Sequence, residues 1–579
     1  MNDITRMLIL NQVEVGIPDR PMLPALLKGV SLQYPQGHLG AIIGPSGCGK
    51  SSLLKAVSGI LEHQAGELFW RGRNLAEAGS DLRAHELGYV PQFSIFHEDL
   101  SVAEIISDAA ALRLSTKSHA DRSQRVEQVL EMAGLREIAQ RRARVLSGGQ
   151  RRRLALAIEL VSNPDLLLCD EVTSGLDPKS EDEIVGLLHH LARQEGRCIL
   201  HVTHSLRHVA YYDSVTVMYD GVVAFQGSPE ELLHYFEVEN RDDIFSALAH
   251  QEAEVWDARY RQGLELQGLP QEPEAGHEEK SSELASQPSA LGPLAWLLTY
   301  GILVRRRWRL FLRERGQWIL QFLLLLTFPG LVVLFGYKGL PEIRNMTLEI
   351  QTDVLAIVQE QLAYSLQMSQ VGTLVSGLIM FEVILLALMG ANNGSREAAS
   401  ERMIWEKEKL AGVSTLPYVA SKLTFLAFLV VVQSFWMTLF VKSVCHFPGP
   451  FLMQFITLAL VNGAITTSCF AISAWSRSVE QASLMSIYLV GFQLPLSGAV
   501  LALPSSLGEL IRPLVAAYWG WSGMLQTMKT TRLYDVAVTL TQTPLSGQQV
   551  CLWLLGMHMV VAVLLAVFGC YRSQWNSQS

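Results

Sequence analysis

The chain divides into two halves that differ in the spacing of their apolar residues. In the first 240 residues, short apolar runs such as Ala41-Ile42-Ile43, Cys198–Val202 and Val215–Met218 alternate with longer polar stretches. Strands interleaved with helices predict an α/β core with a mainly parallel sheet. From about residue 93 to 150 the strand pattern is missing, so we expect a separate helical subdomain inserted at that point.

The second half is dominated by long apolar segments. Six of them are long enough to cross a bilayer: about 317–337, 373–391, 422–443, 451–473, 483–503 and 550–570. They predict an all-α, six-span membrane domain over residues 317–579. The loop between spans two and three is richer in Lys and Arg than the 338–370 loop, which carries only Lys338 and Arg344. The positive-inside rule therefore puts the first half and both termini in the cytoplasm.

Two connecting segments separate the first domain, residues 1–240, from the membrane domain. Residues 241–293 form a connector whose later part, from Gln267, is rich in Gly, Pro, Glu and Ser and is expected to be a flexible linker. Residues 294–316 combine an apolar side with six arginines, which predicts an amphipathic helix on the membrane surface. The alternative is a solvated basic face on a soluble helix.

Composition narrows the classes of protein that remain. A chain of 579 residues is too long for one core. The net charge of −9, without a long basic stripe, argues against nucleic acid as a partner. The seven cysteines show no C-x-x-C and no Cys/His spacing, so neither a zinc site nor a disulfide framework is expected. Residues 1–10 have no long apolar core, and we expect no cleaved signal peptide.

A glycine-rich loop at residues 44–51 fits G-x-x-x-x-G-K-[ST] at every fixed position. Glycines let backbone N–H groups turn toward phosphate oxygens, and the helix that follows adds its positive end. Lys50 is expected to neutralise the β and γ phosphates, and Ser51 to supply a hydroxyl to Mg²⁺. The expected nucleotide-binding residues of this loop are Gly44, Pro45, Ser46, Gly47, Cys48, Gly49, Lys50, Ser51 and Ser52.

Two further segments add chemistry to the phosphate loop. The apolar run Leu166–Cys169 ends in Asp170, a candidate Mg²⁺ ligand, and Glu171, placed to act as general base on the attacking water. Ser147-Gly148-Gly149 opens a helix whose first turn is basic, with Arg151, Arg152 and Arg153. Cations at a helix N-terminus oppose its dipole unless an anion is expected there. The alternative is a basic surface patch on an ordinary helix.

Together these motifs resemble the ATP-binding cassette (ABC) family. The resemblance implies that Ser147, Gly148, Gly149 and Gln150 contact the γ-phosphate of ATP held by a second subunit, with ATP and Mg²⁺ as cofactors. It also implies that Gln92, in Tyr89-Val90-Pro91-Gln92, contacts Mg²⁺. Asp177 is expected to lie at the interface between the two subunits. His204, after Val202-Thr203, corresponds to the switch histidine that senses the γ-phosphate and completes the catalytic pair with Glu171.

The domain order, ATPase first and membrane domain second, resembles the "white"-type half-transporters of the G subfamily and their bacterial relatives. This implies a homodimer, or a pair with a related half-transporter, that exports a hydrophobic, amphipathic or lipid substrate. We refer to Leu146-Ser147-Gly148-Gly149-Gln150 as the signature. A bacterial inner-membrane protein is favoured, because this signature has the general form of the family and because the outer loop before span six is of modest length. Two alternatives remain open: a membrane regulator that acts through a partner protein, and a complex that extracts lipid or passes it to a partner.

Span two carries an isolated carboxylate, Glu382, within Leu378–Leu386. A carboxylate at that depth costs roughly 2.5–3.5 kcal/mol on insertion scales, so it should face the interior of the bundle. Span five supplies Gln493 and Ser497 around Pro495, and a proline can open a helix toward a cavity. The sequence therefore marks Glu382, Gln493 and Ser497 as a possible substrate path. The alternative is that Glu382 is a protonated strut between helices.

Overall fold

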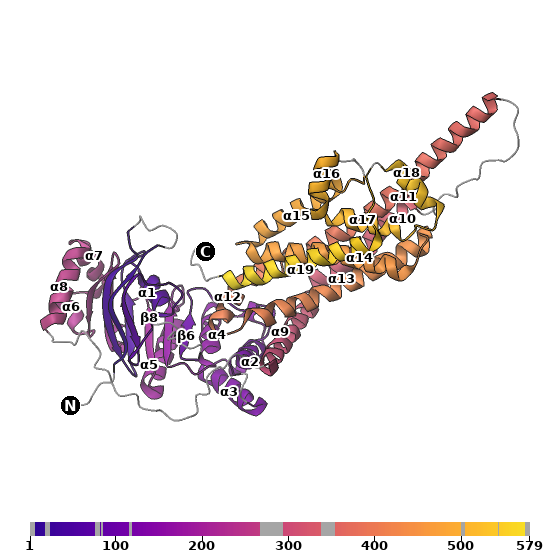
Figure 1. Cartoon of the computed structure of the whole chain (residues 1–579). Helices are drawn as coiled ribbons and strands as arrows, with labels where there is room; N and C mark the ends of the chain where they lie inside the picture. The colour runs from indigo at the N-terminus through magenta and orange to yellow at the C-terminus, as the bar shows by residue number, and fades with distance from the viewer. Residues whose placement is uncertain are drawn as a thin grey trace. The chain divides into compact units, whose positions relative to one another are not determined.

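The computed structural model describes residues 6–17, 24–75, 82, 85–114, 118–266, 293–336, 354–499, 504–541 and 543–573. It separates into two compact units (Figure 1). Unit 1 comprises Met1–Ile302, Lys407–Val413 and Gln574–Ser579, and unit 2 comprises Leu303–Glu406 and Ser414–Ser573. Residues 267–292 of the predicted linker lie outside the described residues, as do Lys338 and Arg344.

Unit 1 is built on a six-stranded sheet in the order β10-β9-β3-β8-β7-β6. Its strands are β3 (Leu39–Ile43), β6 (Leu87–Val90), β7 (Leu166–Asp170), β8 (Cys198–Val202), β9 (Ser214–Tyr219) and β10 (Val222–Gly227). All neighbours pair in parallel except β9 and β10. Strands β3, β7 and β8 are buried along their whole length, as expected for a sheet covered on both faces. The predicted α/β core is confirmed.

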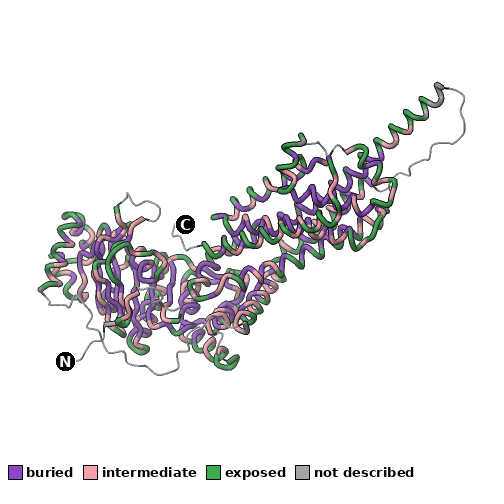
Figure 2. The backbone as a smooth tube through the Cα atoms, viewed as in Figure 1, coloured by how far each residue is buried: buried purple, intermediate pink, exposed green. Residues whose placement is uncertain are grey.

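A second, antiparallel sheet in the order β2-β1-β4-β5 lies within the same unit. It consists of β1 (Arg6–Val15), β2 (Leu27–Pro35), β4 (Ala65–Trp70) and β5 (Arg73–Asn74). Its inward side chains join those of the main sheet in one apolar cluster, which includes Leu10, Trp70 and Leu200. In Figure 2 the strands of the main sheet are coloured mostly as buried. The remaining helices of the core are α1 (Lys50–Val57), α5 (Pro178–Glu195), α6 (Glu231–Phe236), α7 (Ile244–Leu248) and α8 (Ala253–Leu266).

The segment between β6 and β7 is helical, as the sequence predicts. It contains α2 (Val102–Arg113), α3 (His119–Met132) and α4 (Gly148–Leu160). Each of these helices begins with a capping box, in which a serine and the side chain three residues later satisfy each other's backbone N–H groups: Ser101 with Glu104, Ser118 with Asp121, and Ser147 with Gln150. The starts of all three helices are therefore fixed by local sequence.

Unit 2 is helical. It contains the later part of α9 (Pro293–Arg313), α10 (Arg315–Gly336), α11 (Val354–Gly394), the first part of α12 (Arg402–Leu410), α13 (Thr415–Cys445), α14 (Phe451–Trp475), α15 (Val479–Leu496), α16 (Ser505–Ile511), α17 (Ala516–Gln526), α18 (Arg532–Leu540) and α19 (Gln548–Arg572). Among the described residues, five helices are long and apolar enough to span a membrane: those that contain the predicted spans one, two, three, four and six.

The fifth predicted span corresponds to α15, which has 18 residues and is not among those five helices. It carries Glu480 and Gln481 in its first turn and Pro495 near its end. The chain then forms three short helices instead of one long one. The second of these, α17, is almost entirely buried, although no pattern in the sequence predicted it. A six-span arrangement therefore stays a prediction.

Helices α11 and α14 approach each other closely at two glycines one turn apart. A Cβ atom on Gly390 would lie 3.0 Å from the carbonyl oxygen of Asn462, and one on Gly394 would lie 2.3 Å from that of Thr466. Glycines four residues apart let two helix backbones touch, and this geometry is common between membrane helices. The Gly390-x-x-x-Gly394 pair therefore fixes how α11 packs on α14.

Three buried side-chain amides close a ring of hydrogen bonds beside that contact. Gln321 of α10 donates to Asn393 of α11 at 3.1 Å, Asn393 donates to Gln433 of α13 at 2.8 Å, and Gln433 donates back to Gln321 at 2.9 Å. Asn462 of α14 donates to the same oxygen of Gln433 at 3.2 Å. Buried amides must be satisfied internally where water is excluded, and this ring ties four helices together.

Not every arginine of the predicted amphipathic helix is exposed. Arg307 of α9 is buried and makes a bidentate contact with Glu397, at 2.5 and 2.8 Å, with its guanidinium 3.9 Å from the centre of the Phe425 ring. Lys422 contacts Glu397 at 3.2 Å and also pairs with Glu401. These cations hold α9 against α13 through the acidic residues that follow α11. A membrane-surface position for the rest of this helix stays a prediction.

We expect Gly394→Ala to destabilise unit 2, because its methyl group would meet the Thr466 carbonyl at 2.3 Å. Overpacking of this kind typically costs about 1–3 kcal/mol. Thermal unfolding of the purified chain should show a lower midpoint. Gly377→Ala is the matched control on the same helix, because a Cβ there meets nothing within 4 Å. Equal midpoints for the two variants would show that the glycine contact does not determine the packing.

Candidate nucleotide site

Four parallel strands end at one edge of the main sheet, and each is followed by a candidate site residue. Strand β3 leads into Gly44, β6 into Gln92, β7 into Asp170 and Glu171, and β8 into His204. The carboxyl ends of parallel strands are where ligands bind in folds of this class. Residues spread over 160 positions of the sequence are thereby brought together.

The glycine loop adopts the conformation expected for a phosphate cradle. Gly44, Gly47 and Gly49 all have positive φ angles, of 154°, 83° and 103°. A side chain on Gly44 or Gly49 would meet a backbone carbonyl, at 2.3 and 2.8 Å, whereas the space beside Gly47 is open. Helix α1 starts at Lys50, so its positive end lies at the loop. The backbone thus presents N–H groups and a helix dipole to an anion.

Lys50 is only 5% exposed, and its ammonium group lies over the loop. It donates to the carbonyl oxygens of Gly44 and Pro45, at 2.9 and 2.8 Å. Cys48 is also buried, and burial raises the pKa of its thiol. The lysine is therefore positioned where it can exchange its two carbonyl contacts for phosphate oxygens.

Ser51 and Asp170 form the pair that could hold a magnesium ion. The Ser51 hydroxyl donates to one carboxylate oxygen of Asp170 at 2.9 Å, and the Tyr89 hydroxyl donates to the other at 3.4 Å. Burial raises the pKa of Asp170, although the Ser51 hydrogen bond and Lys55 oppose the effect. A divalent cation would offset the cost of burying this charge, and hydroxyl and carboxylate oxygens are its usual ligands. The residues fit Mg²⁺.

Glu171 is held in an uncommon backbone conformation, with a φ of 49°. Its amide donates to the carbonyl of Val202 at 3.1 Å, which continues the pairing of β7 with β8. Its carboxylate contacts His204 Nε2 at 2.9 Å through one oxygen and accepts from Gln92 Nε2 at 2.9 Å through the other. Left-handed residues other than glycine cluster at functional sites. The predicted base, histidine and glutamine thus meet at one carboxylate.

The signature residues do not join this cluster within the chain. Ser147 and Gln150 exchange hydrogen bonds with each other in the capping box of α4, at 3.1 and 3.3 Å. Asp177 accepts from Ser180 at the start of α5 in the same way, at 2.6 and 3.1 Å. Ser147 and Gly148 are exposed. Their predicted contact with ATP would therefore be made across an interface.

The arginines after the signature have partners that the sequence did not identify. Arg151 contacts Glu98 at 2.8 Å, and Arg153 lies 3.7 Å from Glu183. Arg152 donates to the backbone carbonyl of Gln92, the residue that contacts Glu171. Arg152 thereby links the signature helix to the glutamine of the catalytic cluster. Only its place in the first turn of α4 pointed to it.

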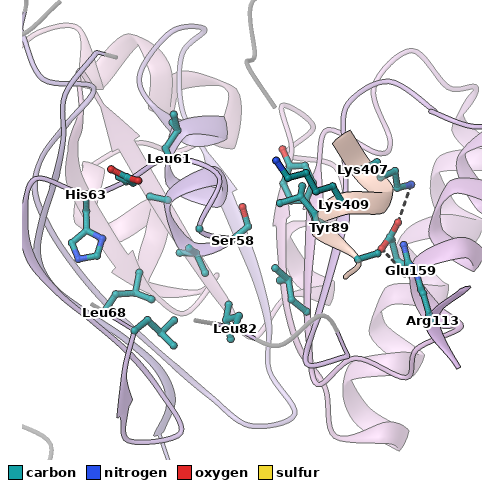
Figure 3. Close-up of a pocket in the computed structure, with 18 residues that line it drawn as sticks. Ser58, Leu61, His63, Leu68, Leu82, Tyr89, Arg113, Glu159, Lys407 and Lys409 are labelled. Carbon is teal, nitrogen blue, oxygen red and sulfur yellow. Dashed lines mark hydrogen bonds and ion pairs between the residues drawn. The ribbon is translucent and has the colours of Figure 1, made fainter. Parts of the chain in front are cut away.

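Near the C-terminal end of α4, one of its own carboxylates is buried and paired with two cations (Figure 3). Glu159 contacts Arg113 of α2 at 2.9 Å and Lys407 of α12 at 2.8 Å. Burial alone would raise the pKa of Glu159, but Arg113 and Lys407 outweigh it and lower the pKa. These residues line a cavity of about 670 Å³ together with Tyr89 and several leucines. The segment Lys407–Val413 is thus anchored in unit 1 by an ion pair.

The three candidates for a substrate path are placed separately in unit 2. Glu382 is 2% exposed in α11. Gln493 accepts from the amide of Ala517 at 3.0 Å and so satisfies the start of α17, and Ser497 donates to Leu494 at 2.7 Å. Within the described residues, no hydrogen bond joins Glu382 to either of them. The path stays a hypothesis, and for Gln493 and Ser497 the contacts observed are structural.

Comparison with known proteins agrees with both units. Residues 27–174 match the model of the ABC transporter family, and residues 299–528 match that of the ABC-2 type transporter family. The ABC transporter ATP-binding/permease protein Rv1747 of Mycobacterium tuberculosis is 30% identical over 563 residues, which is 94% of this chain and 61% of that protein. This chain therefore spans less than two thirds of the length of that relative.

Two ATP-binding proteins match the first half alone. The maltose/maltodextrin import ATP-binding protein MalK of Yersinia pestis is 35% identical over 209 residues, 36% of this chain and 56% of that protein. The iron(3+)-hydroxamate import ATP-binding protein FhuC of Bacillus subtilis is 32% identical over 225 residues, 38% of this chain and 82% of that protein.

The phosphate loop, the acidic strand end and the parallel sheet define a P-loop ATPase domain, which is joined in one chain to a helical membrane domain. The chain thus combines an N-terminal ATPase domain of the ABC transporter family with a C-terminal membrane domain of the ABC-2 type transporter family.

We expect Arg152→Ala to lower the ATPase kcat about tenfold, because small misplacements of a catalytic group have effects of this size or larger. ATP affinity should be unchanged, since Lys50 and the glycine loop are untouched. Arg153→Ala is the matched control, as it removes a neighbouring, half-buried cation whose contacts are with Gly134 and Glu183. Equal rates in the two variants would show that the Gln92 contact has no role in turnover.

Proposed function

We propose that this chain is an ATP-driven half-transporter of the G-subfamily type that works as a dimer and exports a hydrophobic, amphipathic or lipid substrate. The observation that carries the proposal is the convergence of Lys50, Asp170, Glu171 and His204 on one edge of the ATPase domain, in a chain that continues into an ABC-2 type membrane domain. We further propose that the ATPase domain is cytoplasmic and that the membrane is a bacterial inner membrane.

In the proposed mechanism, the glycine loop and Lys50 hold the β and γ phosphates of ATP. A magnesium ion bound by Ser51, Asp170 and Gln92 would supply positive charge at the β and γ phosphates. Glu171 accepts the proton of the attacking water. His204 is hydrogen-bonded to Glu171 and so orients this base, and in the proposed mechanism it also contacts the γ-phosphate.

The proposed dimer follows from the position of the signature. Ser147 and Gly148 are exposed, and the hydrogen bonds of Ser147 close on its own helix. A second copy could therefore place its glycine loop against them, with Asp177 at the seam. Two copies in this arrangement share two ATP sites, and hydrolysis would separate them again.

Helix α12 supports a route from ATP to the membrane domain. Its first residues, Arg402–Glu406, belong to unit 2, and its last, from Lys407, belong to unit 1. Lys407 is anchored there by Glu159, which lies on the helix that begins with the signature. We propose that movement of α4 during the ATP cycle is passed along α12 through this ion pair.

An assay of lipid movement tests the transport proposal. In vesicles that contain the purified chain and a fluorescent phospholipid, ATP should drive the lipid between leaflets. Glu171→Gln should abolish this movement, because removal of a general base lowers turnover about 10²–10⁴-fold. Glu382→Gln should retain basal ATPase activity but lose movement if that carboxylate lines the path. ATPase activity that no lipid or amphiphile stimulates, and that only an added partner protein alters, would contradict transport.

Paired variants test the shared ATP site. Gly148→Asp should block the signature without distorting its own subunit, because a Cβ at Gly148 meets only Leu176, at 3.5 Å. At Gly149 it would meet Ser180 at 2.7 Å, which makes Gly148 the cleaner choice. Gly148→Asp and Lys50→Ala should each be inactive as homodimers while Gly148→Asp still binds ATP.

A co-purified heterodimer of the two variants contains one intact composite site and should recover up to half of the wild-type rate. Full activity in an isolated monomer, or full activity of Gly148→Asp alone, would show that the site is not shared between subunits.

A further inference from the structure

Helix α11 is longer than any membrane crossing requires. It has 41 residues, which is about 61 Å at 1.5 Å per residue, against about 30 Å for the hydrocarbon core of a bilayer. Its last 24 residues, from Val371, carry the buried positions that pack on the rest of unit 2. Figure 1 shows the N-terminal end of α11 extending beyond the other helices of this unit.

The composition of this end is that of a helix in water or at the membrane boundary. Gln359, Gln361, Ser365, Ser369 and Gln370 are all exposed. So many polar side chains are costly in hydrocarbon, so lipid tails do not surround this part of the helix. The structure covers one side of it only. Tyr364, Gln367 and Met368 are half-buried and share the side that faces the rest of unit 2.

The opposite side carries an apolar row. Val358, Leu362 and Leu366 are 56%, 60% and 56% exposed, and they lie four residues apart, so they form one ridge along the helix. We refer to these three residues as the outer row. Single exposed leucines are ordinary, but an aligned row on a helix outside the hydrocarbon indicates a surface that packs on something.

We propose that the outer row is an interface between two copies of this chain, in which the outer ends of the two α11 helices pack against each other. The proposal rests on the dimer of the proposed function. Two copies that share ATP sites in one cytoplasm have the same orientation in the membrane, so their α11 helices run in parallel. Around a two-fold axis the same ridge then meets itself.

Charge and size both favour a second copy as the occupant. The three ridge positions themselves, Val358, Leu362 and Leu366, carry no charge, so two identical ridges do not repel each other along the line where they would meet. Ser365 and Ser369 lie beside the ridge, and small residues allow helices to approach closely. The contact area is small. A small area is enough to keep the two outer ends in contact, because the ATPase domains already hold the two copies together and make this contact effectively intramolecular.

Cysteine cross-linking in membranes tests this interface. All seven native cysteines are buried, so the unmodified chain should give little background. Single variants Val358→Cys, Leu362→Cys and Leu366→Cys should form disulfide-linked dimers under mild oxidation. Gln361→Cys and Ala363→Cys are the matched controls. They are exposed at the same height, on either side of the ridge, and should cross-link several-fold less.

Native mass measurement on the same samples separates this proposal from the dimer itself. Dimers that do not cross-link at the outer row, or that cross-link equally at the row and at the controls, would overturn the interface and leave the shared ATP site intact. Ready labelling of Leu362→Cys by a membrane-impermeant thiol reagent in a dimer would also overturn it, because the row would then be open to water. A monomeric mass would instead contradict the proposed function.

Discussion

The pairing of β7 with β8 is the constraint on which the ATP site depends. Cys169 and Asp170 pair with His201 and Val202 in parallel register, and the amide of Glu171 extends the same ladder by donating to Val202 at 3.1 Å. A shift of one residue would turn the side chain of Asp170 away from Ser51 and that of Glu171 away from His204, because neighbouring side chains of a strand point to opposite faces. The left-handed backbone at Glu171 then directs the carboxylate between His204 and Gln92.

Away from the ATP site, two buried carboxylates are each paired with side chains of opposite charge. Glu159 is buried, which alone would raise its pKa, yet its pKa is lowered because Arg113 and Lys407 both contact it. In unit 2, Glu397 is shared by Arg307 and Lys422 in a comparable way. Removing one partner of a buried pair commonly costs about 3–5 kcal/mol, since the remaining charge is left without compensation. Both clusters lie next to helix ends, where they fix the position of a whole element.

The parts of the fold and site that depend on a local sequence pattern could be predicted. Contacts between residues far apart in the sequence could not. The phosphate loop, the acidic strand end and the capped start of α4 are encoded in contiguous residues, and each forms as expected. The burial of Arg307 against Glu397 could not be predicted, because the two residues lie 90 positions apart in the sequence. The fifth span predicted at 483–503 stays a prediction: α15 ends at Leu496, and residues 500–503 are not described. The buried helix α17 is too short to leave a periodic signal.

The network of amides in unit 2 centres on Gln433. Its Oε1 accepts from Asn393 and Asn462, and its Nε2 donates to Gln321 and Asn393. A side-chain amide has two donor and two acceptor positions, and all four of Gln433 are used. A substitution of this one residue of α13 would therefore leave polar groups without a partner on α10, α11 and α14 at the same time.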